Sequence, residues 1–256
     1  MLYQPIVDLR SGALAKVEAL ARLRLRDGRL IGPSEFLPHF ARRELAELFR
    51  QGLEQALSSL RAWDALGLPL DVCVNLPPSL LALESCVDWV DDALRRHGVA
   101  ASRLSLELLE HPFEHAAMLV ERRALDRLRG LGVSLAMDDF GSGHSDLRRL
   151  AAIPFDALKV DQELTRLFAS DSDAGPPPPR ARTRLRRLLR RLPAEVVVEG
   201  VEDCAALAAA RKLGAGFAQG FGIARPMPWP ALPAWAQDFA TRRCAHAASP
   251  APCAGA

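Results

Sequence analysis

Two adjacent carboxylates, Asp138 and Asp139, close a run of apolar residues and precede the turn segment Gly141-Ser-Gly143. This pattern predicts a buried strand that ends in a sharply turning loop. Adjacent side chains of a strand point to opposite faces, and charged groups are rarely buried without a partner. The pair therefore indicates either a cation site or the cap of a following helix or turn, and both readings stay open for the pair alone.

Further polar side chains lie within or at the ends of other predicted strands. They supply carboxylate, carboxamide and ammonium groups: Glu18, Asn75, Glu107, Lys159, Glu199 and Gln219. Any one of them alone could also be an unrelated cap or a surface residue. Seven successive strands that each present such a group favour a common site.

The elements that carry these residues alternate between strand and helix. Strands are predicted at 2–9, within 14–25, and at 71–75, 104–110, 135–139, 157–161, 195–200 and 216–220. Helices are predicted from Pro33 onward and at 44–66, 87–97, 114–130, 145–152, 183–192 and 203–213. Alternation of this kind predicts a parallel sheet, and about eight strands in 256 residues fit a closed α/β barrel.

Closing such a barrel gathers the strand ends at one mouth, where the active sites of these barrels lie. At least four acids then meet, and they ionise together only if cations neutralise them. Oxygen ligands favour Mg²⁺ or Mn²⁺ over zinc, and Asp138 with Asp139 could serve two ions about 3.5–4 Å apart. Lys159 would hold or deprotonate a water molecule, or balance charge. Unrelated caps and surface acids are the alternative explanation of the set.

Composition sets further limits. The net charge of +2 does not indicate a DNA or RNA partner, and the five cysteines lack CxxC and Cys/His ligand spacing. No signal peptide and no apolar run of 18 residues is present, so we expect a cytoplasmic protein without a membrane segment. Residues 171–182 are predicted to form a Pro-rich surface loop before an Arg-rich helix, and 243–256 are predicted to form a disordered tail after a barrel of 1–242. A solvated outer face is the preferred reading of that helix, with an anion or partner site as the alternative.

The sequence resembles the EAL domain family, the cyclic di-GMP phosphodiesterases, over nearly its whole length. Eight short segments carry the resemblance in the family's order and spacing: Tyr3-Gln-Pro-Ile-Val, Glu18-Ala-Leu20-Ala-Arg22, Val74-Asn75-Leu, Glu107-Leu-Leu-Glu110, Asp138-Asp-Phe-Gly-Ser-Gly143, Lys159-Val-Asp161, Glu199-Gly-Val-Glu202, and Gln219-Gly220 with Arg225-Pro226. The resemblance implies a TIM-like (β/α)8 barrel whose first strand is antiparallel to the others. It also implies metal-dependent hydrolysis of cyclic di-GMP, a bacterial second messenger, to linear pGpG.

The resemblance also assigns roles by position. Two Mg²⁺ or Mn²⁺ ions would be bound per active site, one by Glu18, Asn75, Glu107 and Asp138, and the second by Asp139 with Asp138 bridging and Glu199 assisting. Lys159 would act on the attacking water, with Glu18, Asp139 and Glu199 as the other catalytic residues. The dinucleotide would contact Gln4, Leu20, Arg22, Asn75 and Gln219, with Arg22 on phosphate. Glu110, Glu202 and Asp161 would support the loop at 139–146, which in this family couples metal binding to dimerisation.

The chain departs from the family pattern at Leu109, His144 and Asp146, and none of these is an expected metal ligand. It starts inside the family's first strand, so either the start is misassigned or the chain is a piece of a longer protein with a sensor or GGDEF domain. A homodimer is expected. The main alternative function is an inactive EAL-like receptor or scaffold, against which Glu18, Asp138, Asp139 and Lys159 argue by their presence. A barrel lyase or enolase-type enzyme would share the acids but would leave Gln4, Arg22 and Gln219 unexplained.

Overall fold

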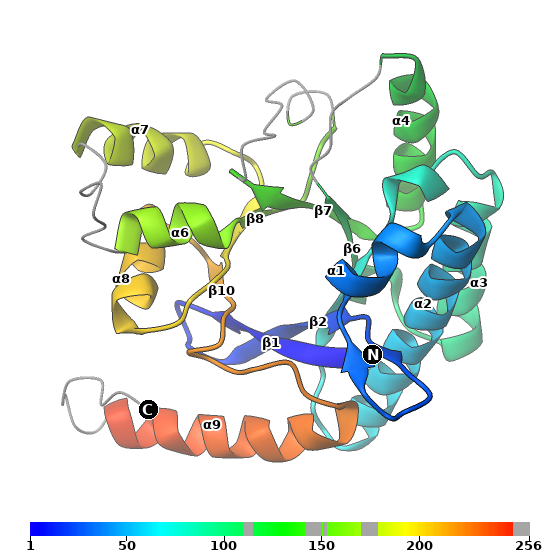
Figure 1. Ribbon diagram of the computed structural model, residues 1–256. Coiled ribbons are helices and arrows are strands. Elements are labelled where there is room, and N and C mark those ends of the chain that lie inside the picture. Colours follow the sequence, from blue (N-terminus) through cyan, green and yellow to red (C-terminus); the bar gives the residue numbers. More distant parts are fainter. Residues whose placement is uncertain (110–114, 142–149, 151–152, 170–178, 248–256) are drawn as a thin grey trace.

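The computed structural model describes the chain except for residues 110–114, 142–149, 151–152, 170–178 and 248–256. Eight strands close a barrel in the order β1-β10-β9-β8-β7-β6-β5-β2 (Figure 1). Their bounds are β1 Leu2–Asp8, β2 Leu14–Leu20, β5 Asp71–Asn75, β6 Leu104–Leu109, β7 Ser134–Phe140, β8 Ala157–Val160, β9 Glu195–Val198 and β10 Phe217–Ala218. Strand β1 pairs antiparallel with both β2 and β10, and the other neighbours are parallel. The predicted barrel with an antiparallel first strand is confirmed.

Helices cover the outside of the barrel, as the alternating pattern requires. They are α1 Pro33–Phe36, α2 Arg42–Ala65, α3 Ser85–His97, α4 His115–Gly130, α6 Gln162–Ala169, α7 Pro179–Leu189, α8 Cys204–Leu213 and α9 Leu232–Ala247. Apolar residues three and four apart give α2 its inner face, where Leu53, Leu57 and Leu60 are fully buried. Strand residues such as Val72 and Leu158 complete the core between barrel and helices.

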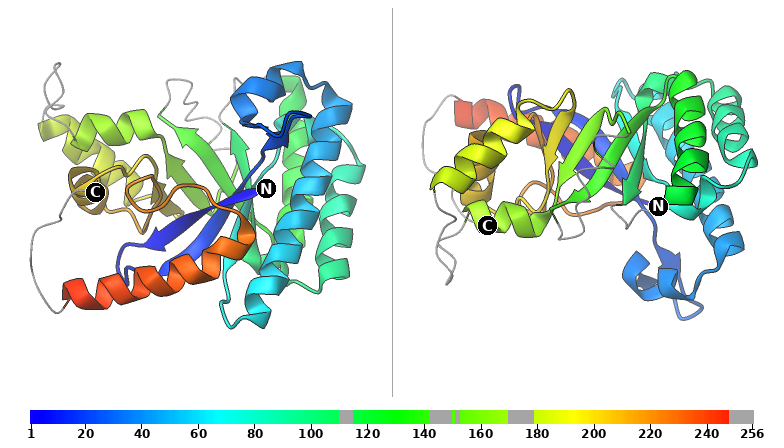
Figure 2. Two further views of the ribbon diagram at one scale, coloured as in Figure 1. Left: turned by 60° about the horizontal axis from the view of Figure 1, so that its bottom comes forward. Right: turned by 90° about the horizontal axis from the view of Figure 1, so that it is seen from above.

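Three elements were not predicted. A two-stranded hairpin, β3 Leu23–Arg24 with β4 Leu30–Ile31, projects beside α1. Helix α6 follows β8 directly, and α9 lies alongside β1 in both orientations (Figures 1 and 2). The two helices were not predicted from the sequence because α6 has only eight residues and α9 has no strongly apolar stripe.

Two predicted boundaries meet the edges of what the structure describes. Helix α7 already begins at Pro179, while 171–178 lie outside the described residues. Helix α9 continues to Ala247, into the segment expected to form a tail, and 248–256 are not described. The division into a barrel of 1–242 and a disordered tail stays a prediction. Within the described residues, no helix combines the length and the apolar run that crossing a bilayer requires.

Candidate active site

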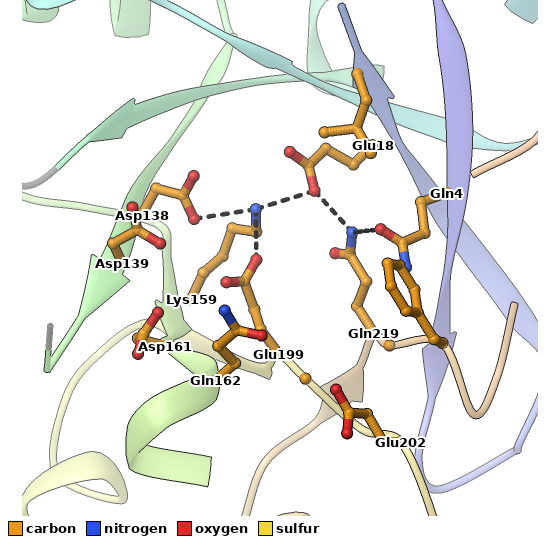
Figure 3. Close-up of a pocket in the computed structure, with 14 residues that line it drawn as sticks. Gln4, Glu18, Asp138, Asp139, Lys159, Asp161, Gln162, Glu199, Glu202 and Gln219 are labelled. Carbon is orange, nitrogen blue, oxygen red and sulfur yellow. Dashed lines mark hydrogen bonds and ion pairs between the residues drawn. The ribbon is translucent and has the colours of Figure 1, made fainter. Parts of the chain in front are cut away.

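A cavity of about 290 Å³ opens at the carboxyl ends of the parallel strands. Its lining gathers polar residues from segments as far apart in the sequence as β1 and β10 (Figure 3). The predicted site residues that line the cavity are Gln4, Glu18, Leu20, Asp138, Asp139, Lys159, Asp161, Glu199, Glu202 and Gln219. The polar strand ends therefore do converge on one mouth.

Lys159 is the centre of this cluster. Its Nζ atom lies 3.2 Å from Glu18, 3.0 Å from Glu107, 3.0 Å from Asp138 and 2.8 Å from Glu199, counted to the nearest carboxylate oxygen. The side chain is 2% exposed. Burial alone would lower the pKa of Lys159, but the four carboxylates outweigh it and raise this pKa well above its ordinary value. Lys159 is therefore an ammonium ion in this arrangement.

Amide groups hold Glu18 in place. Asn75 Nδ2 donates to Glu18 Oε1 at 3.0 Å, and Gln219 Nε2 donates to Glu18 Oε2 at 2.7 Å and to Gln4 Oε1 at 3.0 Å. Burial would raise the pKa of Glu18, yet Lys159 and these amides hold it below its ordinary value. Glu18 is thus kept ionised, with its orientation fixed from two sides.

A bulge in β7 turns both aspartates into the same cavity. The register with β8 shifts between Met137 and Phe140, and Asp139 takes a left-handed conformation with φ 58°. In a regular strand Asp138 and Asp139 would point to opposite faces. The bulge re-aims Asp139, and aspartate is one of the few non-glycine residues that tolerate this backbone region. Both side chains line the cavity as a result.

The remaining acids hold protons more tightly than usual. Burial raises the pKa values of Glu107 and Asp138. Burial, together with the nearby Asp138, raises the pKa of Asp139 to about 6 and that of Glu199 to about 8. One ammonium does not balance this many carboxylates, so the cluster takes up either protons or further cations.

The donor set fits a hard divalent cation. Two groups of carboxylates have ligand atoms within 4.8 Å of one another: Glu18, Glu107 and Asp138, and Asp138, Asp139 and Glu199. Among the described side chains, Glu107 Oε1 is buried without a hydrogen bond, whereas Asp138 Oδ1 lies 3.0 Å from Lys159 Nζ. A buried oxygen that accepts no hydrogen bond is free to bind a metal, and oxygen-only ligands suit Mg²⁺ or Mn²⁺.

Some predicted residues lie elsewhere. Asn75 and Glu107 are outside the cavity lining, but they contact Glu18 and Lys159 from behind. Arg22 is also outside the lining, and its Nη1 donates to the carbonyl of Ala21 at 2.7 Å. Glu110, and with it the loop residues His144 and Asp146, lies outside the described residues.

The two remaining loop-support residues have other contacts. Asp161 precedes α6, and its Oδ1 accepts a hydrogen bond from the N–H of Glu163 at 2.7 Å. Glu202 forms an exposed ion pair with Arg166 at 2.8 Å. An Asp before a helix is an N-cap signal, so α6 could have been found from the sequence.

The sequence reading missed residues at the rim. Gln162 and Phe221 line the cavity together with Gly200 and Gly220, which belong to two of the segments that carry the resemblance. Phe221 is 52% exposed beneath the guanidinium of Arg225. Gln162 is the first residue of α6, and a Cβ atom on Gly200 would lie 2.4 Å from Gln162 Cβ. No local sequence pattern predicts this contact, because it joins residues that follow two different strands, β8 and β9.

Residues 1–226 match the EAL domain family. The chain belongs to this family. Among curated relatives of this EAL domain, cyclic di-GMP phosphodiesterase NbdA of Pseudomonas aeruginosa is 37% identical over 90% of the chain and 29% of its own length. Cyclic di-GMP phosphodiesterase RocR of the same organism is 34% identical over 88% of the chain and 57% of its own length. The EAL domain thus spans about a third to just over half of these relatives.

A solved structure gives the same fold. The EAL domain matches the structure described as "PaMucR Phosphodiesterase, c-di-GMP complex" with a TM-score of 0.78 and 33% identity. The match covers 90% of this chain and 92% of that chain. The resemblance seen in the sequence is confirmed at the level of family and fold.

Proposed function

We propose that this EAL domain is a metal-dependent phosphodiesterase that hydrolyses cyclic di-GMP to linear pGpG. The observation that carries the proposal is that two clusters of three carboxylates each lie at the barrel mouth and share Asp138. Two relatives are named cyclic di-GMP phosphodiesterases, and one matching structure is described as a c-di-GMP complex. Adjacent cation sites with a shared ligand suit in-line displacement at phosphorus.

The two groups correspond to two cation sites, each for Mg²⁺ or Mn²⁺. Glu18, Glu107 and Asp138 would hold one ion with the carbonyl oxygen of Asn75. Asp138, Asp139 and Glu199 would hold the other. Bound ions would polarise the phosphoryl group and make water a better nucleophile at neutral pH.

The protein's own groups would orient the reactants. Lys159 would act on the attacking water, since its Nζ atom lies within 3.2 Å of carboxylates from both groups. Gln4, Leu20 and Gln219 line the cavity and would contact the dinucleotide beside the scissile phosphate. A role for Arg22 on phosphate requires its side chain to leave the Ala21 carbonyl, and it stays a prediction.

A chromatographic time course with cyclic di-GMP tests the proposal, in Mg²⁺, Mn²⁺, Ca²⁺ and EDTA. We expect pGpG to appear only with Mg²⁺ or Mn²⁺. Glu18→Ala should abolish hydrolysis while nucleotide affinity is retained, whereas the exposed Glu44→Ala should behave as wild type. Unchanged turnover in Glu18→Ala would refute the site assignment, and bound nucleotide without product would identify a receptor instead.

Other properties remain predictions of the sequence alone. They are a homodimer, a place in a longer chain with a sensor or GGDEF domain, and a cytoplasmic location. A relative of 34% identity, MucR of P. aeruginosa, is named a bifunctional diguanylate cyclase and phosphodiesterase, which supports the idea of a longer chain. Light scattering of the purified chain would test the dimer.

A further inference from the structure

The stretch that contains α7 has an unusual charge. Residues 179–194 hold seven arginines and no acid, whereas the whole chain has a net charge of +2. The rest of the chain therefore carries a net charge of −5 at neutral pH. Such an asymmetry gives the protein one strongly basic side.

The arginines of α7 that point outward form a stripe. Arg180, Arg184 and Arg187 follow one another at spacings of four and three residues, which places them on one helix face. All three are exposed, and with Thr183 they line a shallow hollow of about 320 Å³. The opposite face is packed into the core through Leu189, which is 2% exposed. The stripe spans about 10 Å along the helix.

This stripe has no counter-charge in the described part of the chain. None of the carboxylates described there forms an ion pair with Arg180, Arg184 or Arg187. Some exposed arginines elsewhere do have such partners, as Arg96 has in Glu54 and Arg29 has in Asp27. Like charges four residues apart destabilise a helix. An anionic surface from outside would relieve this repulsion.

The basic surface continues past the stripe onto α8, against which α7 packs. A second hollow of about 230 Å³ lies between Arg186 and Lys212, with Phe168 and Leu213 among its apolar walls. Leu188, one turn from the stripe, is 38% exposed. Arginine and leucine side chains thus lie together on a surface that faces away from the barrel.

The composition of this surface favours an anionic lipid surface. Helix α7 lies on the outer ring of the barrel (Figures 1 and 2), and its arginines line a shallow hollow there. A helix with an exposed leucine among arginines suits the boundary between lipid headgroups and acyl chains. A nucleic-acid backbone would leave Leu188 without an apolar partner.

We propose that the arginine face of α7 docks this domain on an anionic lipid surface. None of the residues that line the candidate active site belongs to α7. Docking through α7 therefore does not need any of the described residues that line the candidate site. The proposal is independent of the reaction that the domain catalyses.

Co-sedimentation of the purified chain with vesicles tests the proposal. We expect binding to vesicles of phosphatidylglycerol with phosphatidylcholine, no binding to phosphatidylcholine alone, and weaker binding as salt increases. The triple variant Arg180→Gln/Arg184→Gln/Arg187→Gln should bind about 100-fold more weakly, since each basic residue near such a surface contributes about fivefold.

The matched control removes three exposed arginines from other helices: Arg42→Gln, Arg43→Gln and Arg123→Gln. It changes the net charge equally and should keep wild-type binding. Thermal unfolding of both triple variants checks that the fold is intact. Equal loss of binding in the control, or no binding of the wild type to anionic vesicles, would overturn the proposal. Binding of duplex RNA in place of vesicles, lost in the α7 variant, would also overturn it.

Discussion

Removal of the Lys159 ammonium tests how much this one cation stabilises the acid cluster. Lys159→Met keeps an unbranched chain of similar volume, so the change removes the charge without opening a large cavity. Four carboxylates lie within 3.2 Å of Nζ. At an effective dielectric constant of 20, each such contact gives about 5 kcal/mol of attraction.

The net effect is smaller than the sum of these attractions. Desolvation of Lys159 opposes them, and the acids left behind take up protons. Breaking a buried ion pair by removing one partner costs about 3–5 kcal/mol. We expect the free energy of unfolding to fall by about that amount at pH 8 in EDTA. The loss should shrink at lower pH, where the acids are protonated in the variant.

Urea unfolding followed by tryptophan fluorescence measures the effect, since the chain has four tryptophans. The exposed Lys212→Met is the control and should change stability by less than about 0.5 kcal/mol. Added Mg²⁺ or Mn²⁺ should restore part of the stability that Lys159→Met loses. A variant that unfolds at the same urea concentration as the wild type, with the same slope, would refute the central role of Lys159.

Three further outcomes are expected. The pKa of Glu199 is raised to about 8 and that of Asp139 to about 6, so the folded protein holds protons that the unfolded chain has released. The melting temperature in EDTA should therefore fall as the pH rises from 5 to 9, and Mg²⁺ should raise the melting temperature most at high pH. A melting temperature that rises with pH in EDTA would contradict this. Because φ is 58° at Asp139, Asp139→Gly should have a free energy of unfolding equal to that of the wild type or up to about 1 kcal/mol higher, while turnover is lost. Asp139→Val should be less stable than the wild type. Equal melting curves of the two variants would argue against the strained turn. Gly200→Ala should lower the free energy of unfolding by about 1–3 kcal/mol and reduce turnover, since φ is +64° and the new Cβ would lie 2.4 Å from Gln162 Cβ. A variant that melts like the wild type would exclude that contact.

Much of the fold could be read from local pattern. Strand and helix alternate along the chain with periods that side-chain burial imposes, and the number of strands fits one closed barrel. The antiparallel first strand and the family came from eight short segments rather than from periodicity. Helix α6 had a cap signal in Asp161, whereas α9 depends on its position against β1, which no local pattern reveals.

For the site, the sequence by itself determined that the polar groups at the strand ends meet, because the carboxyl ends of parallel strands share one mouth. Only the tertiary structure decided how they meet. The bulge in β7 overrides strand alternation and brings Asp139 to the side of Asp138. Burial and distance, which are properties of the closed barrel, made Lys159 the common partner of four acids and kept Arg22 out of the cavity. Charge balance depends on separations through space, and those separations exist only after the strands have closed.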